Sequence, residues 1–300
     1  MNEIIAIARN TFKEAIRNRI LYVILMFALI LIAFSGVVSE LTISSRERII
    51  KDLGFMAINL FGVAIAVFVG VSLVYNELEK KTIYTIVSKP IGRWQFLLGK
   101  YFGLLLTVWF NVLVMTFFFL ATLHFYAGRV APGDHGFFYV VASSLGKAVV
   151  NIFNWGAYPA THNIMPVIAV TGLELAIITA FAVLYSSFST PTLSMFFTVL
   201  TFVAGRLNED IIRFADQVLR NAAAAAKEAG VAVVKAPLVY YFAMGAAHVV
   251  PNLGAYHRTV EQAVYEPQIQ LWWGTVVYGV LYTIGILCLS ILIFNRRNFK

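Results

Sequence analysis

Six long apolar stretches divide the chain and are separated by more polar segments. Each stretch holds about 20 mostly apolar residues, the length that a helix rising about 1.5 Å per residue needs to cross the hydrocarbon core of a bilayer. We therefore predict an all-α polytopic membrane protein with six transmembrane helices and both termini on one side. The predicted spans are Ile20–Val38, Phe55–Tyr75, Tyr101–Tyr126, Ile164–Tyr185, Phe188–Gly205 and Leu271–Phe294.

The composition places most of this chain in lipid. Hydrophobic residues make up 60% of it, against about 45–50% in soluble domains, and the mean hydropathy is +0.80. The only cysteine, Cys288, lies in the last predicted span, so no disulfide can form within the chain. No boundary divides the sequence, and we interpret residues 1–300 as a single transmembrane domain.

Basic residues are distributed unevenly between the two sides of the predicted membrane. Twelve of the 23 Lys and Arg residues lie in three short segments: before the first span, between the second and third, and after the last. The other loops are longer, and their acids nearly cancel their basic residues. The positive-inside rule therefore predicts a cell (inner or plasma) membrane protein with both termini and segment 77–100 in the cytoplasm. The formal charge of +8 then indicates contact with anionic lipid and not with nucleic acid.

Residues 1–19 have the pattern of an interfacial helix. Apolar side chains recur at helical spacing along one face, and basic and amide side chains occupy the other. We predict that this helix lies on the cytoplasmic leaflet; a helix that extends the first span into water is the alternative. The apolar face consists of Ile4, Ile5, Ala8, Phe12, Ala15 and Ile16.

Segment 77–100 joins two spans and is rich in charge. A stripe of apolar residues spaced four apart predicts a short helix over Glu77–Val87. Pro90 and Gly92 end it, because the residue before a proline avoids the helical conformation, and helix resumes at Arg93. A helix fixed at both ends by spans is suited to receive force from a cytoplasmic partner. An ordinary solvated loop that obeys the positive-inside rule is the alternative.

Two long loops, 127–163 and 206–270, are predicted to be external and helical. In the first, the apolar run Phe137–Trp155 is interrupted by polar residues and favours an interfacial helix. The second contains the helical segment Asn208–Ala229 and the apolar segment Leu238–Val250, which ends at Pro251.

Glu174 is the one acid in the middle of a predicted span, where an ionised carboxylate costs roughly 2.5–3.5 kcal/mol on insertion scales. It therefore needs a partner or water, and Asn59, Asn111, Thr171 and Thr179 are polar neighbours in the spans. Glu174, Asn59 and Asn111 are our candidate pathway residues. A hydrogen-bonded residue of the helix bundle is the equal alternative for Glu174. In the third span, Gly99 and Gly103 permit close approach of another helix.

Motifs for chemistry within this chain are lacking. Gly92 and Gly99-Lys100 are too far apart for a phosphate-binding loop, and Tyr101 replaces the hydroxyl that would bind magnesium. The five histidines show no metal-ligand spacing, and we predict no metal site. We expect no enzymatic activity in this chain.

The order of several motifs resembles the ABC-2 type permeases, in particular the group named for multicopper-enzyme and nitrous oxide reductase maturation. The similarity runs along the full length. Its core lies between the second and third spans. The motifs are Glu77-x-Glu79-Lys80-Lys81-Thr82-Ile83, Ser88-Lys89-Pro90-Ile91-Gly92-Arg93, Gly99-Lys100-Tyr101, Ser186-Ser187-Phe188-Ser189-Thr190-Pro191, Pro251-Asn252-Leu253 and Ile293-Phe294-Asn295-Arg296-Arg297-Asn298-Phe299.

This resemblance implies the permease half of an exporter, working as a dimer with two cytoplasmic ATPase subunits that bind ATP and magnesium. Segment 77–100 would then contain the coupling helix, residues 1–19 would be the connector helix, and part of Leu238–Leu253 would be re-entrant. Membrane lipid and an extracytoplasmic protein are further expected partners. The residues that the resemblance assigns to ATPase coupling are Glu77, Glu79, Lys80, Lys81, Thr82, Pro90, Arg93 and Lys100.

Two other functions are consistent with this hydropathy. A membrane scaffold or assembly factor for metalloenzyme maturation would share the cytoplasmic docking helix and move no solute. A secondary transporter would need several ionisable residues inside its spans, and only Glu174 qualifies. The sequence does not specify the substrate.

Overall fold

The computed structural model describes residues 2–41, 46–79, 92–127, 164–228, 237–265 and 273–296, which form helices and short connections between them. Within these ranges there is no strand, so the all-α class is confirmed. Among the described helices, five are long and apolar enough to cross a membrane: α2 (Arg19–Glu40), α3 (Arg46–Glu79), α5 (Arg93–Ala127), α7 (Ile164–Ser186) and α12 (Trp273–Arg296). The others are α1 (Asn2–Ile16), α8 (Pro191–Arg206), α9 (Asn208–Glu228), α10 (Leu238–Val249) and α11 (Gly254–Tyr265).

Helix α8 occupies the place of the predicted span Phe188–Gly205 but is shorter. It has 16 residues, which at about 1.5 Å each give about 24 Å, less than the hydrocarbon thickness of about 30 Å. Pro191 sets its start, because a proline lacks the N–H that the first helical position leaves unbonded. Only Leu207 separates α8 from α9. The six-span prediction is therefore not confirmed, since five helices of the described ranges reach spanning length.

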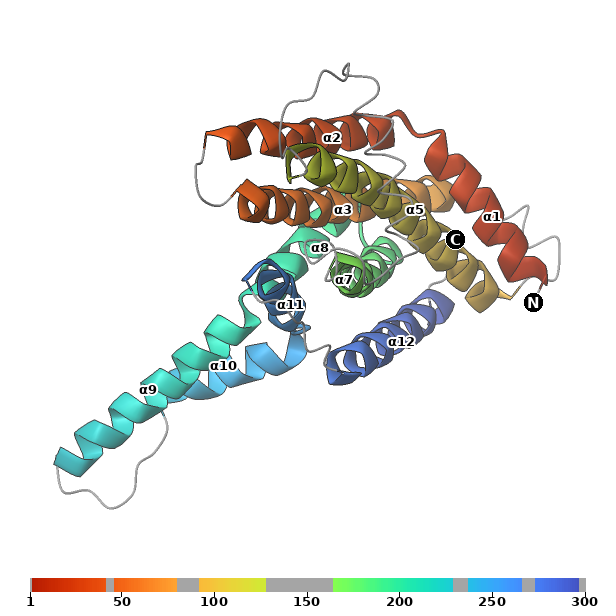
Figure 1. Ribbon diagram of the computed structural model, residues 1–300. Helices are drawn as coiled ribbons and strands as arrows, with labels where there is room; N and C mark the ends of the chain where they lie inside the picture. The colour runs from red at the N-terminus through yellow and green to blue at the C-terminus, as the bar shows by residue number, and fades with distance from the viewer. Residues whose placement is uncertain are drawn as a thin grey trace.

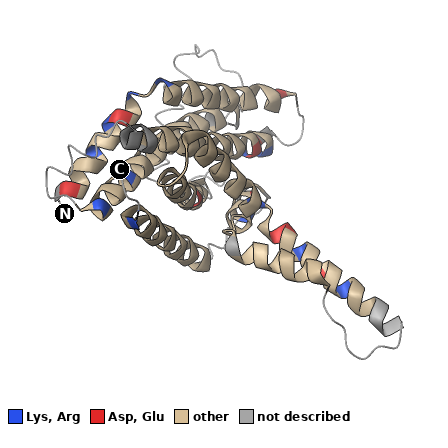
Figure 2. Cartoon of the chain, turned by 180° about the vertical axis from the view of Figure 1, so that it is seen from behind, with Lys and Arg blue, Asp and Glu red and all other residues tan. Residues whose placement is uncertain are grey.

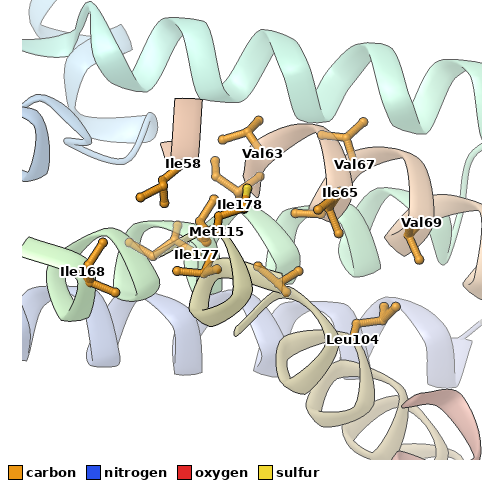
Figure 3. Close-up of a cluster of buried hydrophobic side chains, with 14 of the residues drawn as sticks. Ile58, Val63, Ile65, Val67, Val69, Leu104, Met115, Ile168, Ile177 and Ile178 are labelled. Atoms are coloured by element: carbon orange, nitrogen blue, oxygen red, sulfur yellow. The ribbon is translucent and has the colours of Figure 1, made fainter. Parts of the chain in front are cut away.

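The core lies where α3, α5 and α7 meet, and Figure 3 shows buried hydrophobic side chains of these helices gathered there. In the most apolar stretch of α7, 89% of the residues are buried inside the protein, compared with 28% in the same kind of stretch of α2 and 22% in that of α12. Helix α7 is therefore the centre of the bundle. Helices α2 and α12 lie at its periphery and leave most of their apolar surface for lipid.

Two helices pack across the outside of the bundle and two project from it (Figure 1). Helix α1 lies along the first part of α5, and α11 lies against α3, α7 and α8. Helices α9 and α10 run side by side and extend away from the other helices as an arm. Figure 2 shows that Lys, Arg, Asp and Glu gather on α1, on α9 and near helix ends, with few in the middle of the bundle.

The base of the arm is held by a buried asparagine. The Asn208 side chain, 1% exposed, donates from Nδ2 to the carbonyl oxygens of Ala247 (2.8 Å) and Val250 (3.0 Å). These carbonyls belong to the end of α10, which has no further helical N–H to bond them. Beside them, the Leu253 N–H donates to the Gly205 carbonyl at 3.0 Å. The chain thus returns to the end of α8 before α11 begins.

Helices are observed in the second of the two long predicted loops, and the external position of both loops stays a prediction. The described part of region 206–270 consists of the end of α8, of α9, α10 and α11, and of short connections, and the apolar segment Leu238–Val250 is α10 with its following residue. Leu253 and Tyr256, at the start of α11, are fully buried in the bundle, whereas Leu238 and Phe242 of α10 are each 72% exposed. Residues 128–163, with the predicted interfacial helix, lie outside the described residues.

Candidate functional sites

A buried polar triad joins α3, α7 and α8. Glu174 is fully buried at the middle of α7, and its Oε2 accepts a hydrogen bond of 2.7 Å from Nδ2 of Asn59. Nε of Arg206 lies 3.0 Å from Glu174 Oε1 in an ion pair. The Arg206 Nη2 group donates to Asn59 Oδ1 at 2.7 Å and to Glu174 Oε2 at 3.4 Å. Each of the three side chains therefore contacts the other two.

The triad offsets the free-energy cost of burying the Glu174 carboxylate inside the bundle. A carboxylate removed from water needs an opposite charge and hydrogen bonds, and a guanidinium supplies both in one planar group. Arg206 can reach Glu174 because Arg206 is the last residue of α8, and α8 packs against α7. One turn earlier, the Phe202 ring lies under the guanidinium, with its centroid 5.4 Å from Cζ.

A cleft of about 470 Å³ opens beside the triad and is lined by α3, α8 and α11. Asn59 and Arg206 form part of its wall, whereas Glu174 lies behind them and does not line it. The charged or titratable side chains of the lining besides Arg206 are Asp52, His257 and Glu261. The cleft therefore combines an apolar interior with a few polar groups, as small-molecule sites do.

His257 contributes a neutral imidazole to the cleft. Burial lowers its pKa from the usual 6.5, and the positive charge of Arg206 lowers it further. Glu261, whose Oε1 lies 3.4 Å from His257 Nε2, opposes this shift without reversing it. At neutral pH the ring is therefore mostly uncharged.

A second candidate site lies at the start of α5, which we call the basal end (Arg93–Gly103 with the residues that contact it). Gln95 begins this helix by accepting the Gly92 N–H on its Oε1 at 2.8 Å, an interaction typical of helix N-termini. Arg93 Nη1 donates to the Asn295 carbonyl in the last turn of α12 at 3.1 Å. The rings of Phe96 and Phe294 stack beside this contact at 6.2 Å. The start of α5 is thereby tied to the end of α12.

Helix α1 is docked on the same part of α5. A Cβ at Gly103 would lie 2.6 Å from the Ala8 carbonyl oxygen, and one at Gly99 would lie 2.7 Å from Ile7 Cβ. Only glycine permits so close an approach, so the predicted close contact at this motif is observed. Next to it, Lys100 is 2% exposed and its Nζ lies 3.8 Å from Oε2 of Glu14 in α1.

The structure describes only some of the residues predicted to couple to an ATPase. Glu77 and Glu79 lie in the last turn of α3, and their side chains are outside what the structure describes. Arg93 and Lys100 are placed at the basal end as above. Lys80, Lys81, Thr82 and Pro90 lie outside the described residues.

Of the candidate pathway residues, the structure brings together Glu174 and Asn59. Asn111 is 1% exposed and donates from Nδ2 to the Thr107 carbonyl of its own helix at 2.8 Å. Thr179 bonds in the same way to the Leu175 carbonyl at 2.7 Å. The charged partner of Glu174 is Arg206, which sequence reasoning had assigned to the following loop. The sequence did contain a signal for this ion pair. Glu174 is a lone acid within one apolar run, and Arg206 directly follows another.

The fold defines a polytopic helical membrane protein. The family model of the ABC-2 family transporter protein matches residues 5–299. Because this match covers nearly the whole chain, the chain belongs to the ABC-2 family, whose members are the membrane permeases of ABC transporters. Among curated proteins, no sequence matches it.

Proposed function

We propose that this chain is the permease subunit of an ATP-driven exporter in the cell membrane, and that it works as a dimer of identical copies. Separate cytoplasmic ATPase subunits bind ATP and magnesium and push on the segment between α3 and α5. Both termini and the basal end face the cytoplasm. The spans convert this push into alternating access of the cleft to the two sides of the membrane.

The observation that carries this proposal is the continuity of α3. One uninterrupted helix, Arg46–Glu79, lines the cleft in its first half and continues to Glu79, inside the predicted coupling segment 77–100. Asn59 and Glu79 are 20 positions apart, which corresponds to about 30 Å along the helix axis. A displacement of its last turn is therefore carried to Asn59 and the cleft without an intervening hinge at a loop.

The contacts at the basal end also support transmission of movement from the coupling segment into the bundle. Helix α5 leaves the coupling segment at Arg93 and is bound there to α12 by Arg93 and Phe96, and to α1 by its two glycines. Because the stacked rings of Phe96 and Phe294 are buried and the glycine contacts are close-packed, α1, α5 and α12 move together at this end. A partner that grips residues 80–91 therefore acts on the α1, α5 and α12 assembly on one side and on α3 on the other.

The test is association and coupled hydrolysis with the ATPase. The tagged full-length chain is purified from its native membrane in lipid nanodiscs, and co-purifying ATPase is assayed by ATP turnover. Glu79→Ala with Lys81→Ala should leave the permease inserted and weaken both association and permease-dependent stimulation of turnover. Asp210→Asn, an exposed acid on α9, is the matched control and should change neither.

A scaffold that moves no solute would also bind a partner, so binding alone does not distinguish the two functions. We expect ATP to change the accessibility of the cleft in the complex, whereas a scaffold would leave it constant. Purification without any ATPase, under conditions that retain the dimer, would contradict the proposal.

A further inference from the structure

The cleft beside the triad has apolar walls from three helices. Six side chains form them: Phe55, Met56, Leu60, Phe202, Val260 and Val264. Aromatic rings and branched aliphatic groups of this kind bind the hydrocarbon part of a ligand through dispersion and loss of water. A volume of about 470 Å³ admits a molecule with one or two rings.

The charges that line the cleft do not balance. Arg206 is compensated by Glu174, and two of its nitrogen atoms are already committed to Asn59 and Glu174. His257 is mostly neutral at pH 7, because burial and Arg206 lower its pKa. Asp52 and Glu261 remain, and their carboxylates repel each other. Arg48, which lies outside the lining, offsets part of the charge of Asp52, and Glu261 has no such cation in the lining besides the already compensated Arg206 and the mostly neutral His257. The lining therefore carries excess negative charge.

We propose that this cleft binds an amphiphilic organic cation, with its apolar body against the walls and its ammonium group beside Asp52 and Glu261. An anion would meet two carboxylates and an arginine whose charge is already paired. A bare metal ion fits poorly, since no three His, Cys, Asp or Glu side chains converge as ligands among the residues placed by the structure. The binding stands on these residues alone, whereas the identification of the cation as exported cargo rests on the function proposed above.

The experiment uses three phenylalkyl probes whose head groups differ in charge: 4-phenylbutyltrimethylammonium, 4-phenylbutanol and 4-phenylbutyrate. Each is titrated by equilibrium dialysis against the full-length chain in phosphatidylcholine nanodiscs, with empty nanodiscs subtracted. We expect saturable binding of the ammonium probe and at least tenfold weaker binding of the other two. Asp52→Asn and Glu261→Gln should each weaken binding of the ammonium probe severalfold, and together by about tenfold.

Two further variants separate a specific site from partition into lipid. Met56→Trp fills the cleft with a larger side chain and should abolish saturable binding, whereas Asp210→Asn removes an exposed acid outside the cleft and should leave it unchanged. Equal binding of the ammonium and carboxylate probes, or unchanged binding in Met56→Trp and the double acid variant, would overturn the proposal. Because no ATPase is present, the result is independent of the coupling assay. Stimulation of ATP turnover by the ammonium probe in the complex then tests whether it is cargo.

Discussion

Arg206, the last residue of α8, lies 3.0 Å from Glu174, the buried acid at the middle of α7, measured from Nε to Oε1. This contact explains how an acid is tolerated in the most buried helix of the bundle. It also fixes the end of a helix that is too short to cross the membrane by itself. The pair thus connects the centre of the bundle to the cleft.

Removal of one partner of this pair should cost more than removal of both. Arg206→Met leaves Glu174 as a buried uncompensated charge and should destabilise the protein by about 3–5 kcal/mol. Glu174→Gln with Arg206→Met should recover a large part of that loss, because no charge is then left alone. Thermal or denaturant unfolding in nanodiscs gives the stability of the single and double variants, which together form a double-mutant cycle. Strictly additive effects would show that the two charges do not interact.

Enlarging Gly103 should displace α1 from α5. A leucine there would place its Cβ 2.6 Å from the Ala8 carbonyl oxygen, a clash that typically costs about 1–3 kcal/mol. The readout is maleimide labelling of Thr11→Cys in a Cys288→Ser background, since Thr11 is fully buried in this contact. We expect labelling to rise in Gly103→Leu. The control is Gly285→Ala, where a Cβ meets no atom within 4 Å, and a rise there too would refute the explanation.

Protonation of His257 should destabilise the fold. Its pKa in the folded protein is lowered by burial and Arg206, whereas the unfolded chain titrates near the usual 6.5. Between these two values the unfolded state binds more protons, so stability falls as the pH drops through 6.5 toward the folded pKa. Melting temperatures at pH 7.5 and 5.5 should differ less in His257→Gln than in the unaltered protein. An equal difference in both would assign the dependence to other groups.

The arm should loosen when Asn208 is replaced. Asn208→Ala removes two hydrogen bonds to the last carbonyls of α10 and leaves those carbonyls unpaired, which costs about 1–3 kcal/mol. Amide hydrogen exchange should accelerate in α10 while α7 keeps its protection. Asn221→Ala, an exposed asparagine on α9, is the matched control. Unchanged exchange in Asn208→Ala would show that packing alone holds the arm.

The helices could be predicted from sequence where one physical requirement dominated. Apolar length alone located α2, α3, α5, α7 and α12, and the glycine spacing at Gly99 and Gly103 predicted a close contact. The ends of α3 and α5 could not be predicted from apolar length, because both helices continue through polar residues beyond the apolar stretch. The partner helix at the glycines, α1, depends on tertiary packing and could not be named.

Two members of the triad, Glu174 and Asn59, could be predicted from the sequence, and the third, Arg206, could not. An acid at position 174 demanded a partner, and Asn59 was a candidate because it is an amide in another span. Arg206 was missed because hydropathy assigned it to a loop, and its role depends on where α8 ends relative to α7. The cleft residues on α11 depend on the return of the chain from the arm at Leu253, which no local pattern indicates.

The central claim is that force applied between α3 and α5 reaches the cleft. It is tested most directly by the distance between spin labels at Met56→Cys in α3 and Gln262→Cys in α11, in a Cys288→Ser background, with the permease and its ATPase in nanodiscs. We predict that ATP with vanadate shifts the distance distribution, and that the shift is lost in Glu79→Ala with Lys81→Ala. An identical distribution with and without nucleotide, in a complex that hydrolyses ATP, would contradict the account.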